Sequence, residues 1–238
     1  MISVCIATHN GARYIKEQIE SILCQLGTND EIIISDDGSN DKTIDILLAF
    51  NDKRIIIYSF KQPVKSKHSH TYVCKNFENA LKHAKGDYIF LADQDDWWMP
   101  NKVMKCIEDL KKYTLVVHQA EICNEDLKPK ELLMYRDKFV FKNYLSLKVG
   151  KYYGCTLAFR RELMKYIFPF PDRLVLHDQW IGCMAELTGS VFYEKESLIR
   201  YRQHGNNTSG GPSTNSLWFK IGYRLYMFIN LVLRKFYR

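Results

Sequence analysis

The amino-acid sequence predicts an α/β fold with a mostly parallel central sheet flanked by helices. Short β-branched and aliphatic runs alternate with segments of helical periodicity through the first hundred residues, which is the pattern of successive β-α-β units. Polar clusters, two of them acid-rich, follow three of the predicted strands. Ligands of open α/β sheets bind at the carboxyl ends of the strands, so these clusters are expected to meet in one crevice.

Four strands are predicted in this half, at residues 3–7, 31–35, 54–58 and 88–91. Between the first two, Ile15, Ile19, Ile22 and Leu26 recur at helical spacing, so residues 12–26 are predicted as a helix. Residues 41–50 and 75–84 show the same period. The clusters T-H-N-G, D-D-G-S-N-D and D-Q-D-D follow the first, second and fourth strands.

The second half has a more mixed pattern. A helix is predicted from Pro100 to about Tyr113, followed by strands at 114–118 and 152–160, a helix at 177–187 and a last strand at 198–203. Residues 204–216 are rich in Gly, Asn, Ser and Thr, which predicts a flexible loop. Loops of this kind close over many active sites.

Composition limits the class of protein. The 238 residues are 46% hydrophobic and 26% charged, which is typical of one ordered globular domain and excludes a disordered or fibrous chain. The seven cysteines form no Cys-x-x-Cys pair, so a reducing compartment is expected. The start, MISVCIATHN, has no basic stretch followed by a long apolar one, so we expect no secretory signal and a cytoplasmic location.

The acidic run Asp93-Gln94-Asp95-Asp96, a D-x-D pattern, directly follows the apolar strand YIFLA. Three carboxylates within four residues repel one another, and a bound cation relieves that repulsion. Carboxylate oxygens suit Mg²⁺ or Mn²⁺, with diphosphate oxygens completing the coordination shell. The alternative is a solvated acidic turn that caps the next helix.

Two other acidic positions have a structural and a functional interpretation. In the D-D-G-S cluster, Asp37 could accept hydrogen bonds from a base or ribose and Gly38 could allow a sharp turn, whereas helix capping is the alternative. Asp178 opens a predicted helix in H-D-Q-W. It is either a first-turn carboxylate favoured by the helix dipole or a general base acting on an acceptor hydroxyl.

Basic side chains supply further candidates. Arg202 and His204 precede the flexible loop, where a guanidinium would suit a diphosphate and an imidazole would suit a metal; a surface location is the alternative for His204. His68 and His70 in KSKHSH are compatible with a metal site, but a basic loop that senses phosphate is the preferred interpretation.

The positive charge is concentrated at the end of the chain. Residues 197–238 contain seven basic and no acidic residues, so the first 196 balance 34 − 7 = 27 basic against 27 acidic residues. In the aromatic, apolar tail at 216–238, nine uncharged residues separate Arg224 from Arg234, whereas a bilayer span needs about 20. We predict an amphipathic helix on an anionic membrane surface, with packing on the domain as the alternative. Because the excess charge is outside the predicted crevice, nucleic acid is not an expected partner.

Five motifs, in order, resemble the family 2 inverting glycosyltransferases of GT-A fold: SVCIATHNGARYIKEQIESIL, ISDDGSNDKT, GDYIFLADQDDWWMPNKV, HDQW and YRQHGNNTS. The likeness extends to about Ser209 and is greatest to bacterial enzymes of surface-polysaccharide assembly, including rhamnosyltransferase-like members. It implies a Rossmann-like GT-A domain at 1–209, with a nucleotide-sugar-binding half at 1–100 and an acceptor-binding half at 101–209. A linker and basic amphipathic tail would occupy 210–238.

The resemblance implies that Ala7, Thr8, His9 and Asp37 hold the nucleoside and that Asp93 contacts the ribose or the sugar. The family often has Tyr at the position of His9. An imidazole can also stack on a base, so this departure leaves the nucleoside-binding role in place while making the choice of base less certain.

The resemblance also implies that Asp95 ligates Mn²⁺ or Mg²⁺, that His204 helps to bind the metal or the diphosphate, and that Asp178 is the catalytic base. Arg202 would contact the leaving diphosphate, and Lys67 lies near a position where the family uses a basic residue.

The implied activity is inverting transfer of a hexose or deoxyhexose from a UDP-, dTDP- or GDP-sugar to a hydroxyl of a lipid-linked or growing surface glycan. It would occur at the inner face of the bacterial plasma membrane. Transfer to polyprenyl phosphate and non-catalytic nucleotide binding are the alternatives. A nucleotidyltransferase would need a Gly-rich phosphate loop near the first strand, where the sequence has only Gly11.

Overall fold

The computed structural model describes residues 1–62, 69–135, 152–205, 207 and 216–236. The strands are β1 (Ile2–Thr8), β2 (Glu31–Asp36), β3 (Ile55–Ser59), β4 (Tyr88–Ala92), β5 (Trp97–Trp98), β6 (Leu115–Cys123), β7 (Pro129–Leu133), β8 (Leu157–Arg160) and β9 (Val191–Arg202). The helices are α1 (Ile15–Leu23), α2 (Thr43–Ala49), α3 (Ser69–His83), α4 (Lys102–Leu110), α5 (Met164–Ile167), α6 (His177–Thr188) and α7 (Leu217–Phe236).

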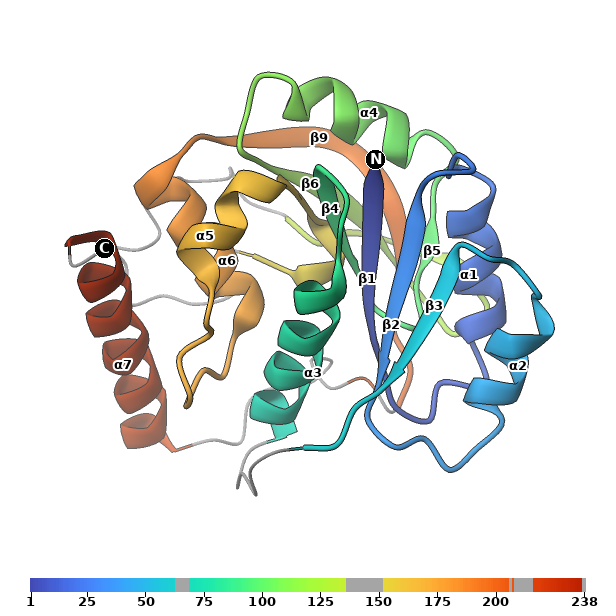
Figure 1. Cartoon of the computed structure of the whole chain (residues 1–238), viewed down its shortest axis with the longest axis horizontal. Helices are drawn as coiled ribbons and strands as arrows, with labels where there is room; N and C mark the ends of the chain where they lie inside the picture. The colour runs from blue at the N-terminus through green and yellow to red at the C-terminus, as the bar shows by residue number, and fades with distance from the viewer. Residues whose placement is uncertain (63–68, 136–151, 206, 208–215, 237–238) are drawn as a thin grey trace.

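The strands form one sheet in the order β3-β2-β1-β4-β8-β6-β9-β5, with β7 paired to β6 (Figure 1). The pairs β1–β2, β1–β4 and β2–β3 are parallel, as is β6–β9. Strand β8 runs antiparallel to both β4 and β6, and β5 runs antiparallel to β9. The sheet is therefore parallel in its first half and mixed beyond β4, and the predicted α/β class with a helix-flanked sheet is confirmed.

Hydrophobic cores cover both faces of the sheet. In β1, Val4 and Ile6 face a core shared with α1, α2 and α4, whereas Cys5 faces a core shared with α3, α5, α6 and α7. The same alternation occurs in β2 and β4. Successive side chains of a strand point to opposite faces, so a strand buried on both faces needs an uninterrupted apolar run. This explains sequences such as EIIIS and YIFLA.

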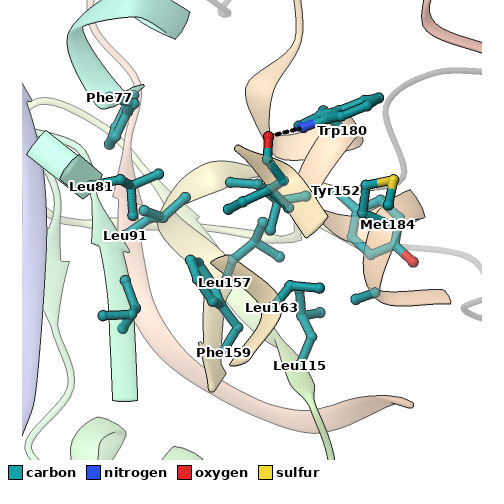
Figure 2. Close-up of a cluster of buried hydrophobic side chains, with 14 of the residues drawn as sticks. Phe77, Leu81, Leu91, Leu115, Tyr152, Leu157, Phe159, Leu163, Trp180 and Met184 are labelled. Carbon is teal, nitrogen blue, oxygen red and sulfur yellow. Dashed lines mark hydrogen bonds between the residues drawn. The ribbon is translucent and has the colours of Figure 1, made fainter. Parts of the chain in front are cut away.

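The core beneath α3 and α6 contains several large side chains (Figure 2). Phe77 and Leu81 of α3 meet Leu91 of β4, while Trp180 and Met184 enter from α6. The buried indole N–H of Trp180 donates to the carbonyl of Ile167 at 3.0 Å. A buried indole requires such an acceptor, and this bond joins α6 to the end of α5.

Several observed elements differ from the predicted ones. The strand expected at 152–160 begins only at Leu157, because a 3₁₀ turn occupies Gly154–Thr156. A Cβ on Gly154 would lie 3.0 Å from Nε2 of His177, so the turn packs tightly against α6. The expected strand at 198–203 is the end of the 12-residue β9. The short strands β5 and β7 were not predicted.

The predicted C-terminal helix is present as α7 and lies beside α6 (Figure 1). Met227 and Leu231 are its buried side chains. The guanidinium of Arg234 donates to three carbonyls at the end of α5 and beyond, those of Tyr166, Phe168 and Pro169. Among the described residues, α7 and the other helices all fall short of the length and apolarity needed to cross a membrane.

Candidate active site

A cavity of about 740 Å³ opens where the carboxyl ends of β1, β2 and β4 meet. Its walls come from the loops after these strands, the start of α3, the start of α6 and the segment after β9. The loops after β1 and β2 touch directly, since Asp37 N donates to Thr8 O at 2.9 Å. The predicted convergence of the three polar clusters is therefore confirmed.

Most of the predicted site residues line this cavity. They are Ala7, Thr8, His9, Asp37, Asp93, Asp95, Asp178 and His204. Arg202 is not among the lining residues, and Lys67 lies outside the described residues.

His9 and Asp37 contact each other at the cavity wall. His9 Nδ1 lies 2.7 Å from the carbonyl oxygen of Asp37, which can only accept, so Nδ1 carries the proton. Nε2 meets Asn10 Nδ2 at 3.2 Å. With both ring nitrogens engaged, the ring face is what His9 offers to a ligand. Asp37 Oδ2 accepts from Gln62 Nε2 at 2.6 Å, and Gly38 turns the chain with φ +67°.

Asp95 and His204 face each other in the same cavity. Asp95 Oδ2 lies 2.8 Å from His204 Nε2, with the two side chains 13% and 7% exposed. Asn207 Nδ2 donates to the same oxygen at 3.4 Å. Burial raises the pKa of Asp95, opposed by the bond from His204. A carboxylate oxygen beside an imidazole nitrogen is a donor set that fits Mn²⁺ or Mg²⁺ with several positions left for other oxygens.

A second acidic group lies deeper. One ligand atom each from Asp93, Asp96 and Cys155 lies within 4.8 Å of the others. The fully buried ammonium of Lys102 donates to the carbonyl of Cys155 at 2.9 Å, and the carboxylates of Asp96 and Asp93 act on its pKa, which burial lowers to about 8. The buried ammonium of Lys102 acts on these carboxylates electrostatically, and a thiol is a poor ligand for hard cations. The assignment of the metal to Asp95 and His204 stays a prediction.

Burial also perturbs Asp93. It raises the pKa of Asp93, and the charges of Asp95 and Asp178 raise it further. Asp96 is fully buried and accepts the backbone N–H of Arg202 at 3.0 Å. Asp96 thus supports the loop, while Asp93 and Asp95 remain on the cavity wall.

The guanidinium of Arg202 is engaged within the protein. It is 4% exposed, donates to Asp95 O at 2.8 Å and Glu17 Oε2 at 2.6 Å, and also donates to Glu125 O. It lies 4.6 Å from the ring centre of Tyr14. These contacts hold the acidic loop against α1. Contact between Arg202 and a diphosphate stays a prediction.

Asp178 lies in the first turn of α6 and also lines the cavity. Its Oδ1 accepts the N–H of Gln179 at 2.7 Å. Burial raises the pKa of Asp178 to about 6, and backbone N–H groups oppose the shift. A carboxyl that titrates near neutrality has the property that a general base needs.

Several cavity residues were not predicted from the sequence, namely Tyr14, Gln62, Gln94, Tyr153 and Asn207. Asn207 lies within the YRQHGNN stretch, whose repeated polar residues could have indicated it. Gln62 and Tyr153 carry no local signal, because each is an isolated residue that reaches the cavity through tertiary packing.

The chain is similar in sequence to known glycosyltransferases. The model of the family described as glycosyl transferase family 2 matches residues 3–168. An uncharacterised glycosyltransferase of Rickettsia typhi is 31% identical over 220 residues, which cover 88% of this chain and 66% of that protein. The dTDP-rhamnosyl transferase RfbG of Shigella flexneri is 28% identical over 250 residues, which cover 98% and 81% of the two chains.

Solved structures share the fold. Staphylococcus aureus TarS 1–349 in complex with UDP aligns with a TM-score of 0.68 and 16% identity, over 98% of this chain and 65% of that one. The Pyrobaculum calidifontis mannosyltransferase PcManGT, in complex with GDP-Man and Mn²⁺, aligns with a TM-score of 0.62 and 17% identity, over 98% and 64%. These likenesses confirm the predicted GT-A fold.

The chain spans just under two thirds of the length of the Rickettsia typhi relative. The family match covers more than half of the chain and includes the loops after β1, β2 and β4 that form the cavity. The chain therefore belongs to glycosyl transferase family 2.

Proposed function

We propose that the chain catalyses the inverting transfer of a hexose or deoxyhexose from a nucleoside-diphosphate sugar to an acceptor hydroxyl. The observation that carries this proposal is the meeting of three groups in one cavity: the His9–Asp37 pair, the Asp95–His204 pair, and Asp178. They match the needs of nucleoside binding, diphosphate binding and proton removal. UDP-, dTDP- and GDP-sugars are the candidate donors, and the name of the Shigella relative favours a deoxyhexose.

In this proposal the nucleoside lies against Ala7, Thr8 and His9. The base stacks on the free face of His9, and Asp37 accepts a hydrogen bond from the base or ribose, since an ionised carboxylate only accepts. Asp93, which also lines the cavity, contacts the ribose or the transferred sugar.

Asp95 and His204 would hold Mn²⁺ or Mg²⁺ in this proposal. The bound ion would offset the negative charge that develops on the departing diphosphate. The donor set supports this assignment, because a carboxylate oxygen of Asp95 and an imidazole nitrogen of His204 lie 2.8 Å apart and both side chains are largely buried.

Asp178 acts as the base. Its carboxylate accepts the proton of the acceptor hydroxyl while the hydroxyl oxygen forms a bond to the anomeric carbon. The bond from that carbon to the diphosphate oxygen breaks on the opposite face of the sugar, so the configuration inverts and no covalent enzyme intermediate is needed. The raised pKa of Asp178, about 6, makes it a stronger base than an exposed aspartate.

The acceptor in this proposal is a lipid-linked or growing surface glycan, presented at an anionic membrane. Large apolar side chains are exposed along α7: Leu217, Trp218, Ile221, Leu225, Ile229, Val232, Leu233 and Phe236. From Trp218 onward, these exposed side chains follow one another at intervals of one to four residues, which places them on one face of the helix. The buried Met227 and Leu231 lie on the opposite face. Lys220 and Arg224 are part-exposed on the same helix, on the side of Met227 and Leu231, so the exposed face offers the membrane apolar side chains.

The experiment is a donor screen with Asp178→Asn beside the wild type. Nucleoside diphosphate release is measured from UDP-, dTDP- and GDP-sugars with Mn²⁺ or with EDTA. We expect one donor class to be turned over, metal to be required, and Asp178→Asn to lower kcat by about 10²-fold or more. Asp45→Asn, an exposed residue on α2, is the matched control.

Other outcomes separate the alternatives. A loss of only a few-fold in Asp178→Asn would favour polyprenyl phosphate as acceptor, because a phosphate is already ionised and needs no strong base. Nucleotide binding without turnover of any donor would contradict the catalytic proposal and leave a nucleotide-binding protein.

A further inference from the structure

Gln94 lies between the two cavity-lining aspartates of the acidic run, and its side chain bonds to the loop after β1. Its Oε1 accepts the backbone N–H of His9 at 3.0 Å, and its Nε2 donates to the carbonyl of His9 at 3.1 Å. One side-chain amide thus engages both backbone polar groups of a residue 85 positions away in the sequence.

Gly11 makes room for this contact. A Cβ at residue 11 would lie 2.5 Å from Oε1 and 2.8 Å from Cδ of Gln94. Both separations are shorter than any Cβ contact tolerates, so a methyl group at this position would displace the amide from His9. The glycine of the T-H-N-G cluster is therefore explained by the side chain that packs over it.

The loop after β2 holds the same segment from its other side. His9 Nδ1 bonds to Asp37 O at 2.7 Å, and Asn10 N donates to Ser39 Oγ at 2.8 Å. Residues 9–10 are therefore fixed between the loop of Asp37 and the loop of Gln94. The next residue after Gln94 is Asp95, which faces His204.

We infer that Gln94 is a positioning residue that sets the spacing between His9 and Asp95, so that the base and the diphosphate of one donor are bound together. This inference rests on the proposed function, in which His9 stacks on the base and Asp95 binds the diphosphate through a metal ion. Gln94 itself need not touch the donor. Loss of its two bonds would leave His9 and Asp95 intact but would let their separation vary.

Two single variants and their combination test this inference. Gln94→Ala removes the amide, Gly11→Ala displaces it, and in the double variant the new methyl group occupies the space that the amide has left. Dissociation constants are measured by calorimetry with Mn²⁺ for UDP, dTDP and GDP, and for inorganic pyrophosphate as a probe that lacks a base.

We expect each single variant to weaken binding of the preferred nucleoside diphosphate about tenfold, as two modest hydrogen bonds would. The double variant should bind no more weakly than the worse single variant, because both changes remove the same contact. Pyrophosphate binding should stay within about twofold of wild type. With the sugar donor, KM should rise while kcat, which depends on Asp178 of α6, should change little.

Equal weakening of pyrophosphate and nucleoside diphosphate would overturn the inference, since Gln94 would then only shape the acidic loop. Additive effects in the double variant, or unchanged nucleoside diphosphate binding in Gln94→Ala, would overturn it as well. If Gly11→Ala does not fold, Gln94→Ala alone still tests the inference, because its binding of nucleoside diphosphate can be compared with its binding of pyrophosphate. A wild-type protein that binds none of the three nucleoside diphosphates would contradict the proposed function itself.

Discussion

Asp178 has the position that both of its sequence interpretations require, and its role as a base stays a prediction. It lies in the first turn of α6, where the helix dipole favours a carboxylate, and it also lines the cavity. Burial raises its pKa from 3.8 to about 6. Because the folded-state pKa is above the unfolded value, Asp178 favours folding below about pH 4, and this contribution is lost as the pH rises through about 6. The fold therefore carries a stability cost at the pH where the ionised base is useful.

We predict a matching pH dependence of activity. The base works in its ionised form, so kcat/KM should rise about tenfold per pH unit below pH 6 and level off above it. The measurement is the initial rate of nucleoside diphosphate release between about pH 4 and about pH 8, which is about two units on either side of that pKa. Asp45→Asn should keep the wild-type profile. A profile that is flat through pH 6 would show that another group removes the proton.

Motifs predicted the chemically distinctive site residues but not the residues that position them. Asp95, His204 and Asp178 lie in short motifs, and all three line the cavity. Gln94 was within a motif, yet its bond to His9 depends on two loops meeting across the sheet. Arg202 was predicted to contact diphosphate, whereas its side chain bonds to Glu17, 185 positions away. Contacts of this kind arise from tertiary packing, which leaves no periodic signal.

At the scale of elements, strands with a long apolar run were predicted from the sequence, whereas very short strands were not. Strands β1, β2 and β4 are buried on both faces and read as apolar runs. The two-residue β5 is too short to show alternation. The strand expected at 152–160 was shortened because Gly154 packs against His177, 23 positions later in the sequence, and turns the backbone.

Helix α7 is apolar on two opposite faces, and only one of them is packed. Arg234 and Lys235 donate to backbone carbonyls of the domain, so two of the basic residues of the tail serve its attachment. The exposed face should therefore be replaceable without unfolding the chain.

We predict that the triple variant Trp218→Ser, Leu225→Ser and Ile229→Ser binds vesicles of anionic lipid at least about tenfold more weakly, since each change removes exposed apolar area that would enter the membrane. Its Tm should match that of wild type. Cosedimentation with vesicles at low and high salt is the measurement, with zwitterionic vesicles as the comparison.

Replacement of the packed face is the control for this variant. Met227→Ser should lower Tm because Met227 is buried. Unchanged vesicle binding by the triple variant would contradict the membrane proposal. A wild-type dimer that the triple variant converts to a monomer would indicate that a second copy of the chain covers this face.

At the scale of the whole molecule, the two sequence halves share one sheet. Strand β4, from the first half, pairs with β8 from the second. Contacts at the cavity join the halves: His204 bonds to Asp95 at 2.8 Å, and Arg13 of the cavity wall bonds to Glu125 at 2.7 Å. The predicted division at residue 100 therefore concerns ligand binding and not folding. We expect the first half to bind the donor and the second half to bind the acceptor, and this stays a prediction.

Because the cavity joins both halves, we predict that its ligand stabilises the entire fold in one step. A ligand at a hundred times its Kd adds about 2.7 kcal/mol to the free energy of unfolding, which for a chain of this size raises Tm by about 5–10 °C. Thermal unfolding followed by circular dichroism should show one transition that shifts as a unit when the preferred nucleoside diphosphate and Mn²⁺ are added. Asp95→Asn should lose the metal-dependent part of the shift because it removes half of the proposed metal site. Two transitions, of which only the first moves with ligand, would instead show that the halves unfold separately and that the contacts across the cavity do not couple them.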